Sequence, residues 1–327
     1  MRSAIPVIFD TDPGIDDAMA LYLLARHPDI DLRAITTIFG NASIEVTTRN
    51  TQRLAAFYGL DLPIASGAGG PLRVGAERDA PAHVHGDDGL GGMVHRLPAA
   101  ARALDPRPAH ELICDMVNAA PGEITLLAVG PMTNLALALR HDPGIAAKVR
   151  QVVVMGGAFG TYGHGGNVTP VAEANIINDP EAADIVFTAG WPVVIIGLDV
   201  TQEVVMTNDF LGDLRGSPAG DFLWEATRHY QDFYDGLHGI GGIFSHDASA
   251  AAYIVAPALF RQRRGPVRVV LDGIACGQTI QDHRKPGAEP NAWSACPPQQ
   301  VCVGVDAEGV RKLFASLFKN SQEGVPQ

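Results

Sequence analysis

A buried strand that leads directly into a group of aspartates, close to the N-terminus, constrains this chain more than any other feature. Residues 7–9 (Val-Ile-Phe) form an apolar run without polar alternation, which is typical of a strand covered on both faces. The turn residues 12–14 (Asp-Pro-Gly) follow at once, and apolar residues recur at helical spacing from Ala18 onward. The pattern predicts a strand, a turn and a helix whose first turn carries Asp16 and Asp17.

Four carboxylates crowd at this strand-to-helix junction: Asp10, Asp12, Asp16 and Asp17. One or two would be ordinary, because Asp is a good N-cap and interacts well with the positive end of the helix dipole. Four cannot all act as caps, and like charges this close repel unless a cation or a proton neutralises them. We therefore predict a hard-cation site of carboxylate oxygens at the carboxyl end of a parallel strand, where open α/β sheets bind ligands.

Strand and helix patterns alternate along the rest of the chain. Further strands are predicted at residues 32–39, 124–129, 152–155, 193–196, 267–271 and 301–305. Helical spacing between them, as over residues 45–58, favours an open, mostly parallel, Rossmann-like α/β sheet flanked by helices. Because no linker-like segment interrupts the pattern, we expect a single domain over residues 1–319 and a disordered C-terminal tail over residues 320–327.

Charge and composition limit the kinds of molecule that this protein is expected to bind and the compartment in which it is expected to work. The 327 residues carry a formal net charge of -12, which argues against nucleic acid or an anionic membrane as a partner and favours a neutral small molecule. No apolar run approaches the roughly 20 residues of a membrane span. The four cysteines show no C-x-x-C spacing and the N-terminus has no signal-peptide pattern, so a cytoplasmic location is expected.

Two loop-rich segments are candidates for the rest of the site. Residues 67–92 are rich in Gly, Ala and Pro and hold His83 and His85, which predicts a long loop that either lines a site or is simply solvated. Residues 208–236 are predicted to be helical, with an aromatic end that belongs more often to a core than to a binding surface. The glycine-rich residues 236–242 that follow indicate a mobile lid.

Taken together, residues 10–18 (Asp-Thr-Asp-Pro-Gly-Ile-Asp-Asp-Ala) resemble the signature of the inosine-uridine preferring nucleoside hydrolases. Other motifs similar to that family follow in its order along nearly the whole chain, at residues 35–37, 40–41, 85–86, 130–134, 155–157, 172–175, 179–183 and 246–247. So many separate matches are far more specific than the Asp-rich segment alone, because phosphohydrolases also use Asp-x-Asp at a strand end.

The resemblance implies a calcium-dependent N-ribohydrolase, a homodimer or homotetramer, that cuts the bond between ribose and base. It implies Asp12, Asp17, Asp247 and the main-chain carbonyl of Val129 as Ca²⁺ ligands, with Asp12 also acting as the general base on a calcium-bound water. The hydrolysis itself also needs such a base, because calcium alone lowers the pKa of the attacking water only modestly. Asp10 is expected to support this cluster.

The resemblance also implies the residues that bind the ribonucleoside. Asp16 and Asn41 would hold the ribose near its 2′-hydroxyl. The residues that would hold the 3′- and 5′-hydroxyls, or lie beside them, are Asn167, Glu173, Asn175 and Met155. His85 and His246 would face the base, and His246 is expected to protonate the leaving group because histidine titrates near neutral pH. A histidine at position 246 favours a nonspecific or pyrimidine-preferring enzyme.

Two alternatives remain open at this point. A metal-dependent phosphohydrolase would use the Asp-x-Asp strand end, but it would want Lys or Arg beside the carboxylates to meet a phosphate, and the motif segments are short of them. A non-catalytic calcium-dependent nucleoside or ribose binder could share every sugar contact and would differ in binding without turnover.

Overall fold

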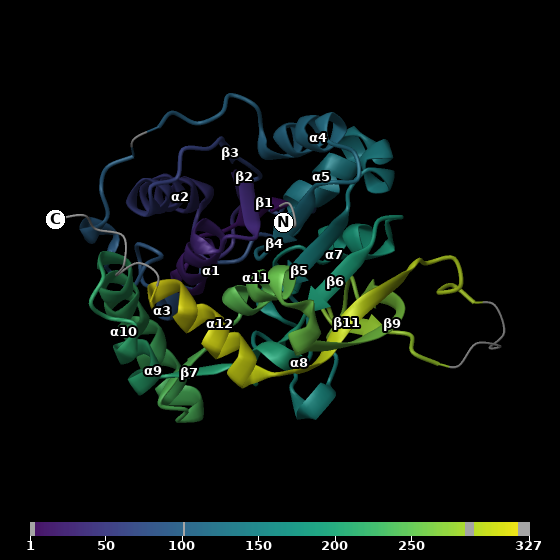
Figure 1. The fold of residues 1–327 in the computed structure, drawn as a ribbon. Helices are drawn as coiled ribbons and strands as arrows, with labels where there is room; N and C mark the ends of the chain where they lie inside the picture. Colours follow the sequence, from purple (N-terminus) through teal and green to yellow (C-terminus); the bar gives the residue numbers. More distant parts are fainter. Residues whose placement is uncertain (1–3, 101, 285–290, 320–327) are drawn as a thin grey trace.

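Nine strands form one sheet, in the order β10-β9-β11-β6-β5-β4-β1-β2-β3 (Figure 1). The computed structural model describes residues 4–100, 102–284 and 291–319, so the tail predicted at 320–327 lies outside the described residues. Neighbours from β11 to β3 pair in parallel, while β9 and β10 are antiparallel, which confirms the mostly parallel α/β sheet. The strands are β1 Ile5–Thr11, β2 Ile30–Thr37, β3 Ile64–Ser66, β4 Thr125–Ala128, β5 Gln151–Met155, β6 Val193–Ile196, β9 Phe260–Val269, β10 Thr279–Gln281 and β11 Pro298–Val305.

Helices cover both faces of this sheet, and a small antiparallel pair, β7 (Val205–Thr207) with β8 (Gly242–Phe244), lies outside it (Figure 1). Within the described residues, no helix combines the length and the apolar character that crossing a membrane requires. The helices are α1 Ile15–Arg26, α2 Ile44–Tyr58, α3 Ala82–His85, α4 Ala109–Ala119, α5 Thr133–His141, α6 Ala174–Asn178, α7 Pro180–Thr188, α8 Leu198–Thr201, α9 Asn208–Asp213, α10 Pro218–His238, α11 Asp247–Val255 and α12 Ala307–Lys319.

Two hydrophobic cores, one on each face of the sheet, explain the apolar run in β1. Val7 and Phe9 pack into the core that also contains residues of α1, α10, α11 and α12. Ile8 points to the other face, into the core with α4, α5 and α7. Successive strand residues alternate between faces, so a strand covered on both sides needs an apolar residue at every position.

The strand order reverses at β1, and this reversal positions the site. From β1 the chain moves outward on one side to β2 and β3, and then returns to place β4 on the other side of β1. The loops after the two adjacent strands therefore diverge, and they leave a crevice at the carboxyl ends of β1 and β4. Asp12 follows β1 and Val129 follows β4, so both lie at this edge.

Three sequence-based assignments need correction. The helix expected over residues 208–236 is two helices, because the Ser217 hydroxyl caps a new helix by accepting from Gly220 N, with Pro218 at its first position. The strand expected at 267–271 is the end of the longer β9, which stops at Val269. Residues 67–92 are not wholly loop, since α3 forms one helical turn that ends at His85.

Candidate active site

Three carboxylates from two helix N-termini meet in the interior. Asp16 and Asp17 lie in the first turn of α1 and Asp247 opens α11, and one oxygen of each lies within 4.8 Å of the others. All three side chains are buried. Helices α1 and α11 pack against each other in one core, which brings together residues 230 positions apart in the sequence.

Asp12 is held between two stretches of backbone at the same place. Its Oδ2 accepts from the main-chain N–H of Asn41 at 2.8 Å, whereas its buried Oδ1 has no hydrogen-bond partner. Gly40 and Gly130 approach the carboxylate so closely that a Cβ on Gly130 would lie 2.5 Å from Oδ1. Glycine is therefore needed at both positions, because any side chain there would collide with the Asp12 carboxylate. One oxygen of Asp12 remains available to a ligand.

Asp17 is the best-supported member of the cluster. Its Oδ1 accepts from the Thr11 hydroxyl at 2.5 Å, and its Oδ2 accepts from Gly14 N at 2.9 Å and from the Asn41 side-chain amide at 3.1 Å. Three donors, at the end of β1, in the β1–α1 turn and in the loop after β2, thus fix its orientation. Asn41 contacts two of the predicted ligands at once, through its backbone and through its side chain.

Burial makes negative charge expensive in this cluster. It raises the pKa of Asp12 well above its ordinary value and that of Asp16 to about 8, with the charge of Asp17 adding to both. Burial also raises the pKa of Asp17 and Asp247, the latter with help from Asp16 and the other nearby carboxylates. Asp12 and Asp16 each retain a buried oxygen without a hydrogen-bond partner. The carboxylates repel one another, and some of their oxygens lack a hydrogen-bond partner. A group of oxygen donors with these two properties fits a bound metal cation.

We expect the metal-free protein to lose thermal stability as the pH rises from 5.5 to 8.5. Folding raises the pKa of Asp10 to about 7 and that of Asp16 to about 8, so the folded chain holds protons that the unfolded chain releases. The stability from such groups is fully present below their ordinary pKa and is lost as the pH passes through the raised values. In EDTA the melting temperature should fall by at least about 5 °C over this range. Excess calcium should flatten the decline, and identical slopes with and without the metal would contradict a cation site.

Asp10 lies below the cluster and is tied to the sheet. Its Oδ1 accepts from the Thr36 hydroxyl at 2.5 Å and from the Asn134 side-chain amide at 2.8 Å, while Oδ2 is buried without a partner. Burial raises its pKa to about 7 despite these two bonds. Asn134 lies in a recognisable sequence motif, but its contact with Asp10 depends on the fold, which places the start of α5 against the end of β1.

The carbonyl of Val129 is next to a predicted ribose ligand. The Asn175 side-chain amide donates to this oxygen at 2.7 Å and to the Met155 carbonyl at 3.2 Å. Asn175 therefore bridges the ends of β4 and β5 from its place on α6. Val129, Met155 and Asn175 therefore lie next to one another, at the same edge of the sheet as the carboxylates.

Glu173 and Asn167 occupy different environments. Glu173 is buried, and its carboxylate caps α6 by accepting from Asn175 N and Ile176 N and also accepts from Gly157 N at 3.0 Å. Asn167 is exposed, and its Oδ1 accepts from Ala174 N at 3.0 Å. Asn167 thus lies at the rim, tied to the helix that carries Asn175, and not among the buried groups.

The two histidines of the 67–92 segment point in different directions. His85 is buried, accepts from Ile15 N through Nδ1 at 3.3 Å, and lies with its ring centroid 5.3 Å from that of Tyr230. His83 is exposed and packs edge-on against Phe233. The single turn of α3 therefore directs His85 to the start of α1 and leaves His83 outside.

His246 belongs to a directional hydrogen-bond chain that sequence reasoning missed. Tyr234 donates its hydroxyl proton to Tyr230 at 3.0 Å, and Tyr230 donates to Asp16 Oδ2 at 3.4 Å. The Tyr234 oxygen is left to accept from His246 Nε2–H at 2.8 Å, so Nδ1 accepts from the Thr201 hydroxyl at 2.7 Å. Tyr230 and Tyr234, assigned to a core from their spacing, are buried but also serve the site; their i, i+4 placement on α10 was the available signal.

Burial changes the proton affinity of both histidines. It lowers the pKa of His246 to about 4 and that of His85 to about 3, where the neighbouring histidines add to the effect. Both imidazoles are therefore neutral at pH 7 in this structure. The expectation that His246 titrates near neutral pH is wrong, because it was based on the ordinary pKa of histidine and did not include the effect of burial.

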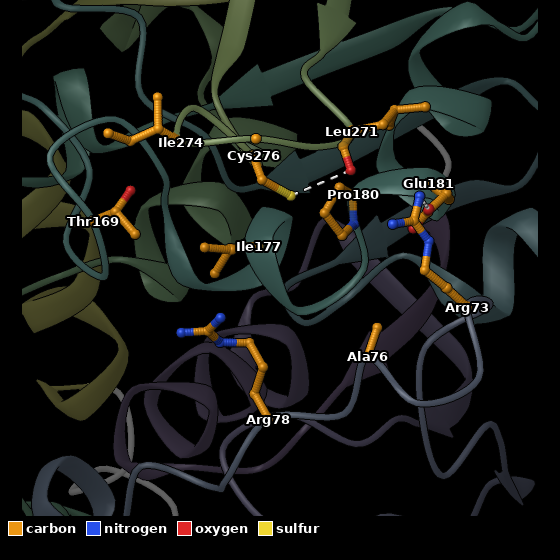
Figure 2. A pocket seen from close by; sticks show the side chains of 11 residues that line it. Arg73, Ala76, Arg78, Thr169, Ile177, Pro180, Glu181, Leu271, Ile274 and Cys276 are labelled. Atoms are coloured by element: carbon orange, nitrogen blue, oxygen red, sulfur yellow. Dashed lines mark hydrogen bonds and ion pairs between the residues drawn. The ribbon is translucent and has the colours of Figure 1, made fainter.

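A pocket of about 300 Å³ lies away from these residues, between the 73–78 segment, the start of α7 and the 271–276 turn (Figure 2). Arg73 pairs with Glu181 at one side, and the Cys276 thiol donates to the Leu271 carbonyl at 3.4 Å. None of the predicted catalytic, sugar-binding or metal-binding residues lines it. The candidate site is therefore the buried carboxylate cluster and not this pocket.

Comparisons with known proteins identify the family of this chain. Uridine nucleosidase 1 of Arabidopsis thaliana is 39% identical over 321 residues, covering 96% of this chain and 93% of the relative. Non-specific ribonucleoside hydrolase RihC of Salmonella newport (strain SL254) is 39% identical over 325 residues, covering 97% and 99%. A solved plant nucleoside hydrolase, the PpNRh1 enzyme, is similar with a TM-score of 0.91 and 39% identity, covering 96% of this chain and 98% of that one. The family model described as inosine-uridine preferring nucleoside hydrolase matches residues 7–312, and the chain belongs to this family of enzymes.

Proposed function

We propose that this enzyme hydrolyses ribonucleosides to ribose and free base with Ca²⁺ as its cofactor, and that it is nonspecific or prefers pyrimidines. The observation that carries the proposal is the buried carboxylate cluster at the β1–β4 crevice, with oxygens of Asp12 and Asp16 that lack partners. Among the described residues, the hydrogen bonds of Asp12, Asp16 and Asp17 come from hydroxyl, amide and main-chain groups and not from Lys or Arg, which a phosphate site would want.

The ligands that would hold calcium are Asp12, Asp17, Asp247 and the carbonyl oxygen of Val129. All are hard oxygen donors, as Ca²⁺ prefers. When bound, the cation supplies positive charge that offsets the repulsion among the carboxylates and attracts the ribose diol and the attacking water. The Thr11 and Asn41 donors on Asp17 keep its carboxylate oriented for this role.

Asp12 is proposed as the general base. Asn41 N–H fixes one oxygen of its carboxylate and leaves the other free to take a proton from water. Because the transition state of glycosidic cleavage is oxocarbenium-like, the nucleophile needs only to be held and deprotonated as the bond to the base breaks. A positioned base of this kind contributes on the order of 10²–10⁴-fold.

Polar side chains around the crevice are proposed to hold the ribose. Asp16 and Asn41 would meet the 2′-hydroxyl side from the first turn of α1 and the loop after β2. Glu173 and Asn175, both on or beside α6, would meet the 3′- and 5′-hydroxyls together with Asn167 at the rim, and Met155 would lie alongside. Several of these groups are already oriented by backbone hydrogen bonds, which lowers the cost of ordering them when the sugar binds.

His246 is proposed to assist departure of the base through its hydrogen-bond chain. A neutral imidazole would give its Nε2 proton to the leaving base as a replacement proton passes from Asp16, whose pKa burial raises to about 8, through the hydroxyls of Tyr230 and Tyr234 to Nε2. The departing base then holds the proton, and the negative charge is left on the Asp16 carboxylate. His85 would face the base from the other side of Tyr230. The preference for pyrimidine or mixed bases is supported by these two histidines and by the substrates named for the uridine nucleosidase and RihC relatives.

We also propose that the enzyme works in the cytoplasm as a homodimer or homotetramer. All four cysteines are free, which suits a reducing compartment. The acidic net charge keeps non-specific association with nucleic acid unfavourable.

A reducing-sugar assay on the purified protein tests the proposed activity. Uridine, inosine, cytidine, adenosine and guanosine are compared with and without EDTA, followed by added calcium. We expect ribose release that stops on chelation, returns with calcium and is fastest with uridine or inosine. Calcium-dependent binding without ribose release would instead identify a binder, and activity that survives EDTA would refute the metal assignment.

A further inference from the structure

A second group of metal-ligating side chains lies on the outside of the molecule, where α4 and α5 pack together. His110 and Glu111 belong to the first turn of α4, and His141 is the last residue of α5. One donor atom of each lies within 4.8 Å of the others, and the two imidazole centroids are 5.7 Å apart with the rings at 69°. His110 and Glu111 are half-buried and His141 is exposed.

This group is separate from the carboxylate cluster. Helix α5 begins with Thr133 and Asn134, whose side chains reach Asp179 and Asp10, and it ends at His141. The nine residues of the helix span about 12 Å from first to last at 1.5 Å per residue. His141 is thus a full helix length from the end that faces the candidate active site.

The neighbouring charged groups are engaged elsewhere. Arg107 donates to Asp105 and to Asp115, and the carboxylate of Asp142 accepts from Asn118 and Gly144 N. In the ranges that the structure describes, no hydrogen bond or ion pair is found for the side chains of His110, Glu111 or His141. Their donor atoms lie close to one another, and the carboxylate of Asp142 also interacts electrostatically with His141.

We propose that His110, Glu111 and His141 bind a divalent transition metal of the zinc class and thereby join α4 to α5. Two imidazoles and one carboxylate are ligands that Zn²⁺ favours, and exposure leaves its fourth position to water. Tetrahedral binding needs donor atoms about 3.4 Å apart, which rotation of partly exposed side chains can reach from their present separation. Calcium, which prefers oxygen donors, is expected to avoid this nitrogen-containing site and to occupy the carboxylate cluster instead.

Titration of Zn²⁺ into the full-length protein in excess calcium, followed by calorimetry, tests the proposal. We expect the variant His110→Ala/His141→Ala to lose one zinc equivalent that the wild type binds, and Glu111→Gln to bind that equivalent at least about tenfold more weakly. His95→Ala, which removes an exposed histidine elsewhere, is the matched control and should bind like the wild type. Cobalt(II) in place of zinc should give a visible spectrum in the wild type that the double variant lacks.

A thermal measurement separates loss of the ligands from loss of the fold. Zinc should raise the melting temperature of the wild type and of His95→Ala but not that of the double variant, and all three should release ribose equally without zinc. Equal zinc stoichiometry and affinity in the wild type and the double variant would overturn the proposal, as would no zinc binding by the wild type. Binding is measured apart from turnover, so the result is independent of the proposed function.

Discussion

Asp12→Asn should lower kcat on uridine by about 10²- to 10⁴-fold at saturating calcium. The amide keeps the shape of the side chain and can still accept from Asn41 N–H, but it cannot take a proton from water. It also removes one negative charge from the group that would hold the cation, so the calcium concentration for half-maximal activity should rise. Steady-state kinetics over a calcium series measure the two effects separately.

Asp10→Asn is the matched control for this substitution. The same chemical change two residues earlier keeps the Oδ1 that accepts from Thr36 and Asn134, and the other oxygen of Asp10 has no hydrogen-bond partner to lose. Because the pKa of Asp10 is already raised to about 7, loss of its charge should cost little. We expect its kcat to stay within about threefold of the wild type. Equal losses in the two variants would remove Asp12 from the role of general base.

His246→Ala should slow hydrolysis of uridine and inosine by about 10²-fold or more while changing hydrolysis of a nitrophenyl riboside less than about tenfold. A natural base leaves as a poor anion and needs a proton, whereas nitrophenolate leaves without one. The ratio of kcat/KM for the two kinds of substrate therefore reports on leaving-group assistance and not on general damage to the site.

Tyr234→Phe extends this test to the hydrogen-bond chain. The substitution keeps the ring, which packs against Tyr230 and Phe244, and deletes only the hydroxyl that accepts from His246 and donates to Tyr230. We expect the same selectivity for poor leaving groups in a weaker form. If His246→Ala and Tyr234→Phe lower activity equally on uridine and on the nitrophenyl riboside, neither residue assists the leaving group.

Local pattern was enough to predict the framework of the protein. The apolar run 7–9, the turn at 12–14 and the aspartates that follow predict a buried strand and a helix N-terminus, and β1 and α1 lie there. Such patterns are reliable because they depend on neighbours within a few residues. The break between α9 and α10 was missed, although Ser217 and Pro218 carried the local signal for it.

The composition of the site depended on contacts distant in sequence. The chain alone determined that several carboxylates crowd at one strand end and that His246 and Asp247 precede an Ala-rich helix. Only the tertiary structure decided that Asp247 reaches Asp16 and Asp17, that His85 points inward, and that tyrosine hydroxyls on α10 connect His246 to Asp16. It also decided the direction in which each pKa shifts, because these shifts come mainly from burial, and burial is a property of the packed chain and not of the residue type.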